Sequence, residues 1–442
     1  MMVLLGSIFI AIGKHIGIAD PVIAVNLVSV VFSSIAILAF YLLVQKICNN
    51  PLTSTIASLI LLLNPIFLDV STYGINHAPA ICFLLLGLLS ILHFKNSGNL
   101  AHLMGGALFF GLMGATRLQD FILTFPAIAS LFFLNLQSKP IKFDKHKALH
   151  LFLFITSIIL IIALFHLPYF ISNHTGYDTQ AKEFWRIGLS ENFRGLFSKF
   201  LIRALSYLIR AFSLIGIFSF GAGLFYISRS YKGLFTFITL WWLIPLSFYG
   251  NISTSAPRFF NIMLPALIIP TSILLTNLLQ HKNMLRRSVA ATVLLLILFG
   301  PLLDTYQTFI RRHYYALIPD YYRWVGNLTP PDATIISSDE DLFISYYSKR
   351  EPLPKPVSFG HLAPKELIDF KNKIDNILKN KKPLYITHSA FTLYDHHHEF
   401  QKLMRQNYRL ILIGQMPLEL WYITPFNPQL HMSSLLKIER KD

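Results

Sequence analysis

An acidic side chain and an imidazole lie close together in the sequence, between two long apolar stretches. Asp69 closes one apolar run, and Asn76 and His77 come immediately before the next. Runs this apolar and this long are typical of helices that cross a bilayer, so the segment Asn64–Phe94 predicts a helical hairpin with a polar tip. At such a tip, a carboxylate and an imidazole either face a reaction cavity or simply end two helices at the interface.

Two arginines also border apolar runs. Arg117 follows a glycine-rich run, and Arg258 opens the stretch RFFNIMLPALIIP. A guanidinium is costly in lipid, so each arginine is expected to face the protein interior or an anion. The alternative is a snorkelling interfacial arginine or a structural ion pair, for instance Arg117 with Asp120.

Metal and cofactor signatures are not found in the sequence, which has no nucleotide-binding glycine loop and no GxSxG elbow. The densest cluster of ligand-type residues is DHHHE at 395–399. Consecutive histidines on a helix point in different directions, which favours a solvated helix face over a metal site. We therefore predict no metal ligands, and a divalent metal is not indicated. Gly105, Gly106, Gly111 and Gly114 indicate close helix packing rather than a phosphate loop.

The composition is that of an integral membrane protein. Hydrophobic residues make up 54% of the chain and charged residues 14%, with a mean hydropathy of +0.52, whereas soluble domains carry about 25% charged residues. The net charge of +16 does not indicate nucleic acid, because only eight of the 22 acidic residues precede residue 307. The expected partner is instead anionic membrane lipid or a phosphate-bearing substrate.

The apolar runs predict about ten membrane crossings, several of them short and therefore tilted or half-buried. They cover 22–44, 52–70, 78–94, 102–116, 121–136, 148–171, 211–227, 233–249, 259–279 and 288–305, after a short interfacial or re-entrant helix near the start. Lysine and arginine gather in alternate connections, at 45–51, 95, 138–147, 229–232 and 280–287. The positive-inside rule predicts that these connections are cytoplasmic.

One outer connection, residues 174–210, is long and basic. Its apolar residues between 193 and 205 recur at helical spacing, with cations on the other side that include Arg203, and Arg186 precedes them. This pattern predicts an amphipathic helix along the membrane interface. The helix either rests on lipid headgroups or forms a lid over a lipid-phosphate pocket.

The chain changes character after residue 306. Residues 307–442 are charged and rich in tyrosine. Helices are predicted at 319–328 and 364–379, and strands at 333–337, 384–387, 408–413 and 418–424. We therefore predict a mainly α protein: a transmembrane bundle over 1–306 and a small extracytoplasmic α/β domain over 307–442.

The order of these features resembles the C-type (GT-C) glycosyltransferase superfamily, in particular the aminoarabinose transferases and protein O-mannosyltransferases. The similar stretches are DPVIAVNLVSVVFSSIAILAFYLL, ASLILLLNPIFLDVS, GGALFFGLMGATRLQDFILTFPAI, PRFFNIMLPALII, YRWVGNLTPPDATIIS and ISYYSKREPLP. The resemblance implies a multi-pass enzyme of the cell membrane that takes a sugar from a polyprenyl-phosphate donor on the outer face. Members usually begin with one further helix and an acidic outer loop, and the chain starts near the point where that loop ends.

An inverting sugar transfer needs a carboxylate to take the acceptor's proton and cations to stabilise the leaving lipid phosphate. Asp69 is the first candidate for the base and Asp20 the second. The candidate substrate-binding residues are Arg117, Arg258, His77, Arg186 and Arg203.

Three functional hypotheses remain open from the sequence. The first is a polyprenyl-phosphate-dependent glycosyltransferase, or the larger part of one. The second is a catalytically inactive relative that binds lipid phosphate, or a subunit whose partner supplies the missing acidic loop. The third is a transporter, although the sequence shows no convincing internal repeat.

Overall fold

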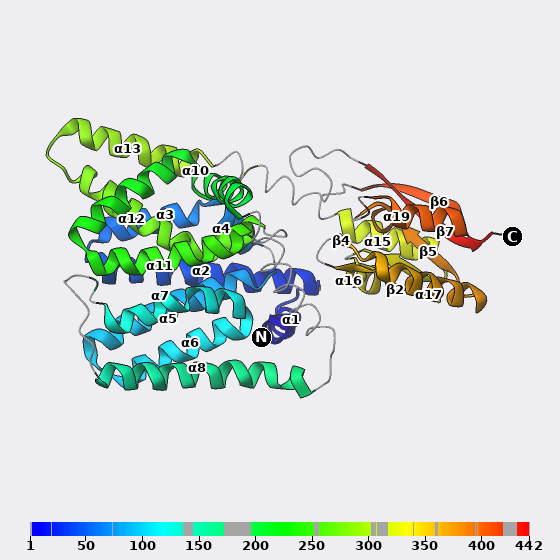
Figure 1. The fold of residues 1–442 in the computed structure, drawn as a ribbon, viewed down its shortest axis with the longest axis horizontal. Helices are drawn as coiled ribbons and strands as arrows, with labels where there is room; N and C mark the ends of the chain where they lie inside the picture. Colours follow the sequence, from blue (N-terminus) through cyan, green and yellow to red (C-terminus); the bar gives the residue numbers. More distant parts are fainter. Residues whose placement is uncertain are drawn as a thin grey trace. The chain divides into compact units, whose positions relative to one another are not determined.

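The computed structural model describes residues 2–18, 20–72, 74–134, 136, 145–171, 196–251, 256–301, 306, 317–338, 340–358, 361–393, 395, 397–418 and 431–441. The chain separates into two compact units, Met1–Thr305 and Tyr306–Asp442 (Figure 1). Each unit has its own hydrophobic core.

The first unit is a helical bundle. Its elements are α1 (Met2–His15), α2 (Pro21–Cys48), α3 (Pro51–Leu62), α4 (Pro65–Ser71), α5 (His77–Ser97), α6 (Leu100–Thr116), α7 (Leu118–Phe133), α8 (Lys145–Ile171), α10 (Leu196–Ser230), α11 (Lys232–Asn251), the 3₁₀ helix η3 (Pro257–Met263), α12 (Leu264–Leu279) and α13 (Met284–Phe299). Within the described residues, six helices are long and apolar enough to cross a membrane, or seven if α3 and α4 form one bent span. The predicted multi-span bundle is confirmed, but the count of about ten crossings is not, because helices such as α6 and α7 have only 17 and 16 residues.

The apolar run 52–70 is broken rather than continuous. The axes of α3 and α4 differ by 66°, and the break lies at Asn64 and Pro65. The Asn64 Oδ1 atom accepts hydrogen bonds from the backbone amides of Ile66 and Phe67, and Pro65 occupies the first helical position of α4. A capping asparagine followed by proline starts a new helix, so this pair sets the direction of α4.

The glycines of α6 allow close packing on α8, which lies beside it (Figure 1). A Cβ atom at Gly111 would lie 2.6 Å from Ile161, and one at Gly114 would lie 2.4 Å from Ile162. Side chains larger than hydrogen would push the two helices apart, so the predicted role in helix packing is confirmed for Gly111 and Gly114.

Helix α10 contains the described part of the predicted amphipathic connection. Residues 196–210 belong to α10, which bends at Ser213, where φ is 59° and ψ is 168°. Figure 1 shows the two halves of α10 running in different directions. Residues 174–195, and with them Arg186, lie outside the described residues.

The second unit is a small α/β domain, as predicted. Its elements are α15 (Leu317–Leu328), β1 (Thr334–Ser337), α16 (Asp341–Phe343), the π-helical turn η4 (Ile344–Ser348), β2 (Glu351–Pro354), β3 (Val357–Ser358), β4 (His361–Leu362), η5 (Pro364–Glu366), α17 (Leu367–Lys379), β5 (Leu384–Thr387), α18 (His388–Thr392), α19 (Glu399–Asn407), β6 (Tyr408–Leu418) and β7 (His431–Arg440). The main sheet has the order β2-β1-β5-β7-β6. Strand β1 is parallel to β2 and β5, and β7 is antiparallel to β5 and β6.

Most predicted elements of this domain are confirmed: both helices and the strands at 333–337, 384–387 and 408–413. The predicted strand at 418–424 lies almost entirely outside the described residues. Strand β2 was not predicted because Pro352 and Pro354 interrupt its pattern, and proline is tolerated there because β2 is an edge strand.

The sequence favoured a solvated helix face at 395–399, and the structure differs from this prediction at Asp395. Helix α19 begins only at Glu399, and Asp395 is buried with 4% of its surface exposed. Its carboxylate accepts hydrogen bonds from the backbone amides of Phe400 and Gln401 at 3.2 and 2.9 Å. Asp395 therefore satisfies the first turn of α19, where unpaired amides otherwise remain.

Candidate functional site

Arg117 occupies a non-helical link between α6 and α7, with φ of −147° and ψ of 86°. Its Nε atom donates to Asp120 Oδ2 at 2.6 Å, and Nη2 donates to Oδ1 at 3.4 Å. The side chains of Arg117 and Asp120 are only 9% and 2% exposed. The structural ion pair considered from the sequence is therefore present, and it is buried.

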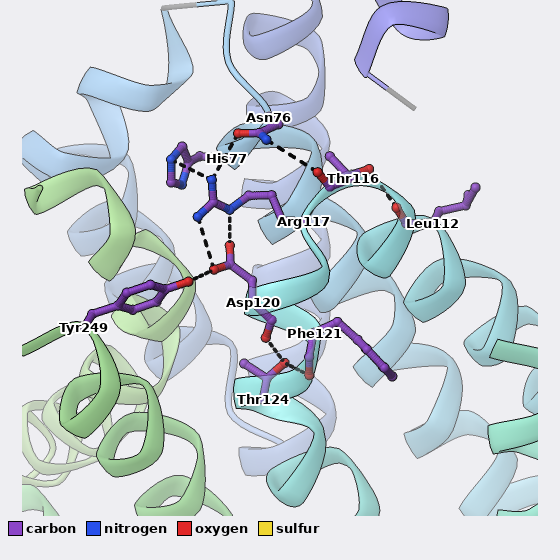
Figure 2. A network of polar contacts seen from close by, with 9 residues as sticks. All are labelled: Asn76, His77, Leu112, Thr116, Arg117, Asp120, Phe121, Thr124 and Tyr249. Carbon is purple, nitrogen blue, oxygen red and sulfur yellow. Dashed lines mark hydrogen bonds and ion pairs between the residues drawn. The ribbon is translucent and has the colours of Figure 1, made fainter. Parts of the chain in front are cut away.

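Two further elements converge on this ion pair (Figure 2). Nη1 of Arg117 donates to Asn76 Oδ1 at 3.1 Å and lies 3.0 Å from Nε2 of His77, at the start of α5. The Tyr249 hydroxyl, from the end of α11, donates to Asp120 Oδ1. The pair thus ties together three segments that are far apart in the sequence.

The contact with Arg117 determines the protonation state of the His77 ring. A guanidinium nitrogen can only donate a hydrogen bond, so Nε2 of His77 must accept it with a lone pair. In this arrangement His77 is neutral and carries its proton on Nδ1. Its Nε2 atom is therefore engaged and cannot serve as a base while the contact persists.

Phe259 in η3 is the common neighbour of three predicted site residues. Its ring centroid lies 5.4 Å from Cζ of Arg117 and 5.7 Å from Cζ of Arg258. The His77 ring is 5.5 Å away, and the Tyr249 ring is stacked at 5.2 Å. The structure therefore brings Arg117, His77 and Arg258 together around one aromatic ring.

The two arginines differ in how their charge is used. Arg117 is buried and its guanidinium already donates to a carboxylate and an amide oxygen. Arg258 is exposed, and within the described residues it forms no ion pair. Because only an accessible cation can meet a ligand without losing existing bonds, Arg258 is the better anion-binding candidate of the two.

The predicted carboxylates occupy different positions. Asp69 is half-buried on α4, which packs against η3, the element that carries Arg258. Asp20 is half-buried and caps α2, where its Oδ1 accepts from the backbone amide of Val22 at 2.8 Å. Of the two remaining predicted residues, Arg203 belongs to α10 but its side chain lies outside what is described, and Arg186 lies in a stretch that is not described at all.

Tyr249 and Phe259 were not predicted from the sequence. Tyr249 is separated from Asp120 by 129 residues, and it lies at the end of an apolar run with ordinary composition. An aromatic residue at such a position is typical of any membrane interface. No local signal therefore distinguishes the two residues from interfacial aromatics.

Among the described residues, no group of three or more His, Cys, Asp or Glu side chains could hold a metal ion. A polar cluster of another kind lies in the second unit, beyond the ends of β1, β2 and β5. Glu340 accepts a hydrogen bond from Thr387 at 3.1 Å, and Nζ of Lys355 donates to the carbonyl oxygen of Ala390 at 3.1 Å. Burial lowers the pKa of Lys355 to about 8, although the carboxylates of Asp395 and Glu340 oppose this shift.

The comparisons with known proteins agree with this fold. The sequence model of the dolichyl-phosphate-mannose-protein mannosyltransferase family matches residues 4–169, which is less than half of the chain. No curated protein matches the sequence.

Solved structures of other proteins resemble the chain over nearly its whole length. ArnT from Cupriavidus metallidurans, in the apo state, has a TM-score of 0.60 at 10% identity over 98% of this chain and 87% of ArnT. The archaeal oligosaccharyltransferase AglB from Archaeoglobus fulgidus has a TM-score of 0.56 at 14% identity over 93% of this chain and 64% of AglB. Arabinofuranosyltransferase AftD from Mycobacteria has a TM-score of 0.52 at 13% identity over 98% of this chain and 36% of AftD.

These three proteins are GT-C glycosyltransferases, and at such low identities the likeness establishes the fold. The chain is a multi-pass membrane protein with the GT-C fold, and the resemblance predicted from its sequence is confirmed.

Proposed function

We propose that this chain is a glycosyltransferase that moves a sugar from a polyprenyl-phosphate donor to an acceptor on the outer face of the membrane. The observation that carries the proposal is the GT-C fold across 98% of the chain. A structure of ArnT with the same fold contains undecaprenyl phosphate, and one of AglB contains a dolichol-phosphate. The second unit would lie on the same outer side, as the distribution of basic loops predicts.

Arg258 is the proposed contact for the lipid phosphate. It is exposed and lies beside Phe259, against which the buried ion pair is also packed. A cation placed in advance stabilises the negative charge that develops on a leaving phosphate. Arg117 would act indirectly, by holding His77 and Phe259 in place. Arg186 and Arg203 would add positive charge from the segment 174–210.

Asp69 is the proposed base. Asp120 is bound by Arg117 and Tyr249, and Asp20 caps the first turn of α2, so each of these two carboxylates has a structural role. Asp69 lies on the short helix α4, which packs directly against the element of Arg258. A general base must come within hydrogen-bond reach of the acceptor hydroxyl, and the packing of α4 on η3 supports Asp69 in this role.

Binding of the donor is tested with undecaprenyl phosphate and the full chain in nanodiscs. Arg258→Gln should weaken binding by about tenfold or more, since a charge-assisted hydrogen bond contributes about 1.5–3 kcal/mol. Arg405→Gln is the matched control, because Arg405 is also exposed and also lies over a phenylalanine, Phe391, at 5.7 Å. Equal binding by both variants would rule out Arg258 as the phosphate contact.

Transfer is tested separately with polyprenyl-phosphate sugars and membrane extracts as acceptors. Asp69→Asn should abolish transfer and leave undecaprenyl phosphate binding unchanged, because the amide cannot take a proton. Transfer that survives this substitution would exclude Asp69 as the base.

The second hypothesis from the sequence predicts a different outcome. An inactive relative would bind undecaprenyl phosphate through Arg258 but show no transfer in the wild type. Asp20 and Asp120 are both engaged in structural contacts. If Asp69 is not the base, these contacts favour an inactive relative over an enzyme that uses Asp20 or Asp120. Transfer restored by adding a second membrane protein would identify a partner that supplies the acidic loop.

A further inference from the structure

A polar cavity lies in the helical bundle, and its volume is about 430 Å³. Hydroxyl and amide groups dominate its lining, which includes Asn50, Thr53, Tyr226, Tyr231, Thr276 and Asn277. These residues come from the ends of α2, α10 and α12 and from the starts of α3 and α11. The candidate site around Phe259 involves the opposite ends of α11 and α12, so the two sites are distinct.

The cavity lies at the level where the candidate membrane spans end. Four of these spans have an end within a few residues of its lining, at Cys48, Ser230, Lys232 and Leu279. Helix ends of this kind lie in the headgroup region of a bilayer. Lipid headgroups are therefore the molecules that surround the cavity at the highest local concentration.

The sequence segments that supply most of the cavity lining carry charge of one sign. Lys46 lies in the last turn of α2, Arg229 in the last turn of α10, and Lys232 begins α11. The segments 45–53, 226–236 and 270–287 contain no aspartate or glutamate. Such surroundings favour a negatively charged ligand, and they offer no carboxylate to pair with an ammonium group.

The lining offers hydrogen bonds that the protein itself does not use. The Thr53 and Thr276 hydroxyls bond to each other at 3.1 Å. Within the described residues, however, the side chains of Tyr226, Tyr231 and Asn277 have no hydrogen-bond partner. Phenol and amide groups both donate and accept, which suits the hydroxyl groups of a polyol.

We propose that this cavity binds the headgroup of an anionic phospholipid whose phosphate carries a polyol, such as phosphatidylglycerol. The phosphate would lie toward Lys46, Arg229 and Lys232, and the hydroxyl groups would bond to Tyr226, Tyr231 and Asn277. The site is independent of sugar transfer, so its test does not depend on the proposed function.

The protein carries its own reporter of occupancy. Cys48 lines the cavity and is half-buried, whereas Cys82, the other cysteine, is 0% exposed. The rate at which a water-soluble maleimide modifies Cys48, located by peptide mass spectrometry, therefore reports access to the cavity. Nanodiscs expose both membrane faces, so the measurement does not depend on orientation.

The experiment compares the full chain in nanodiscs of phosphatidylcholine alone and with added phosphatidylglycerol or phosphatidylserine. Phosphatidylglycerol should slow modification of Cys48, whereas phosphatidylserine, which has the same net charge but an ammonium group, should slow it much less. Asn277→Ala should relieve the protection by about fivefold, the equivalent of one lost hydrogen bond of about 1 kcal/mol. Asn96→Ala, a matched exposed asparagine outside the cavity, should behave like the wild type.

Four results would overturn the proposal. Equal rates in all lipids would mean that the cavity holds only water. Equal protection by both anionic lipids, or protection that Asn277→Ala leaves unchanged, would mean that charge alone acts. Protection by soluble glycerol phosphate in phosphatidylcholine nanodiscs would identify a soluble ligand instead of a lipid.

Discussion

Replacing Asp120 by asparagine tests whether the Arg117–Asp120 pair holds the site together. The substitution preserves side-chain shape but leaves the guanidinium of Arg117, which is 9% exposed, without its counter-charge. Breaking a buried ion pair by removing one partner costs about 3–5 kcal/mol, and the remaining amide oxygen places Asp120→Asn near the lower value. For a unit of this size, about 3 kcal/mol corresponds to roughly 6 °C in the thermal midpoint.

The matched control is the Asp320–Arg323 pair of the second unit. It joins the same residue types at the same spacing, but both side chains are 57% exposed. Exposed pairs contribute about 0–1 kcal/mol, so Asp320→Asn should leave the stability of its own unit nearly unchanged. The difference between the two substitutions isolates the effect of burial.

Thermal unfolding in detergent, followed by tryptophan fluorescence at one scan rate, measures both effects. Trp241 and Trp242 lie on α11, the same helix as Tyr249, and Trp324 lies on α15 of the second unit. Replacing the tryptophans of one unit by phenylalanine lets the fluorescence report the other unit alone. The double variant Arg117→Met/Asp120→Asn should lose less stability than the sum of its single variants, because it leaves no unpaired charge in the interior. Additive losses, or equal effects of Asp120→Asn and Asp320→Asn, would refute the reasoning.

Three further predictions follow from other contacts. Tyr249→Phe removes a hydrogen bond to the Asp120 carboxylate and should cost about 1.5–3 kcal/mol in the same unfolding assay; no change would mean that the hydroxyl does not support the ion pair. Gly223→Ala places a Cβ atom 2.3 Å from a backbone oxygen of α12 and should cost about 1–3 kcal/mol, whereas Gly221→Ala, with nothing within 4 Å, should be neutral or slightly stabilising. The pKa of Lys355 falls from 10.5 to about 8 on folding, so its charged form opposes folding below about pH 8 and the stability of the second unit should rise from there toward about pH 10. Thermal midpoints of the Trp324 signal across this range check the slope, which Lys355→Met should remove.

Local sequence patterns predicted much of the fold because they depend on nearest neighbours. Long apolar runs require a bilayer, and the glycines of α6 act within one or two helical turns. The break at Asn64 and Pro65 was not predicted, although its capping signal is also local. The same reasoning identified most strands of the second unit, where buried residues alternate with polar turns. It did not identify β2, because proline at an edge strand depends on which strands lie beside it.

At the candidate site, too, the sequence predicted local features, and only the structure showed the contacts between distant segments. The sequence by itself determined that the chain crosses a membrane several times, that cations border its apolar helices, and that Arg117 can pair with Asp120 three residues away. Only the tertiary structure decided that His77, Tyr249 and Phe259 surround that pair, from positions up to 139 residues from Asp120. The physical reason is that contacts between helices depend on how whole helices pack and rotate against one another, which no short stretch of sequence encodes.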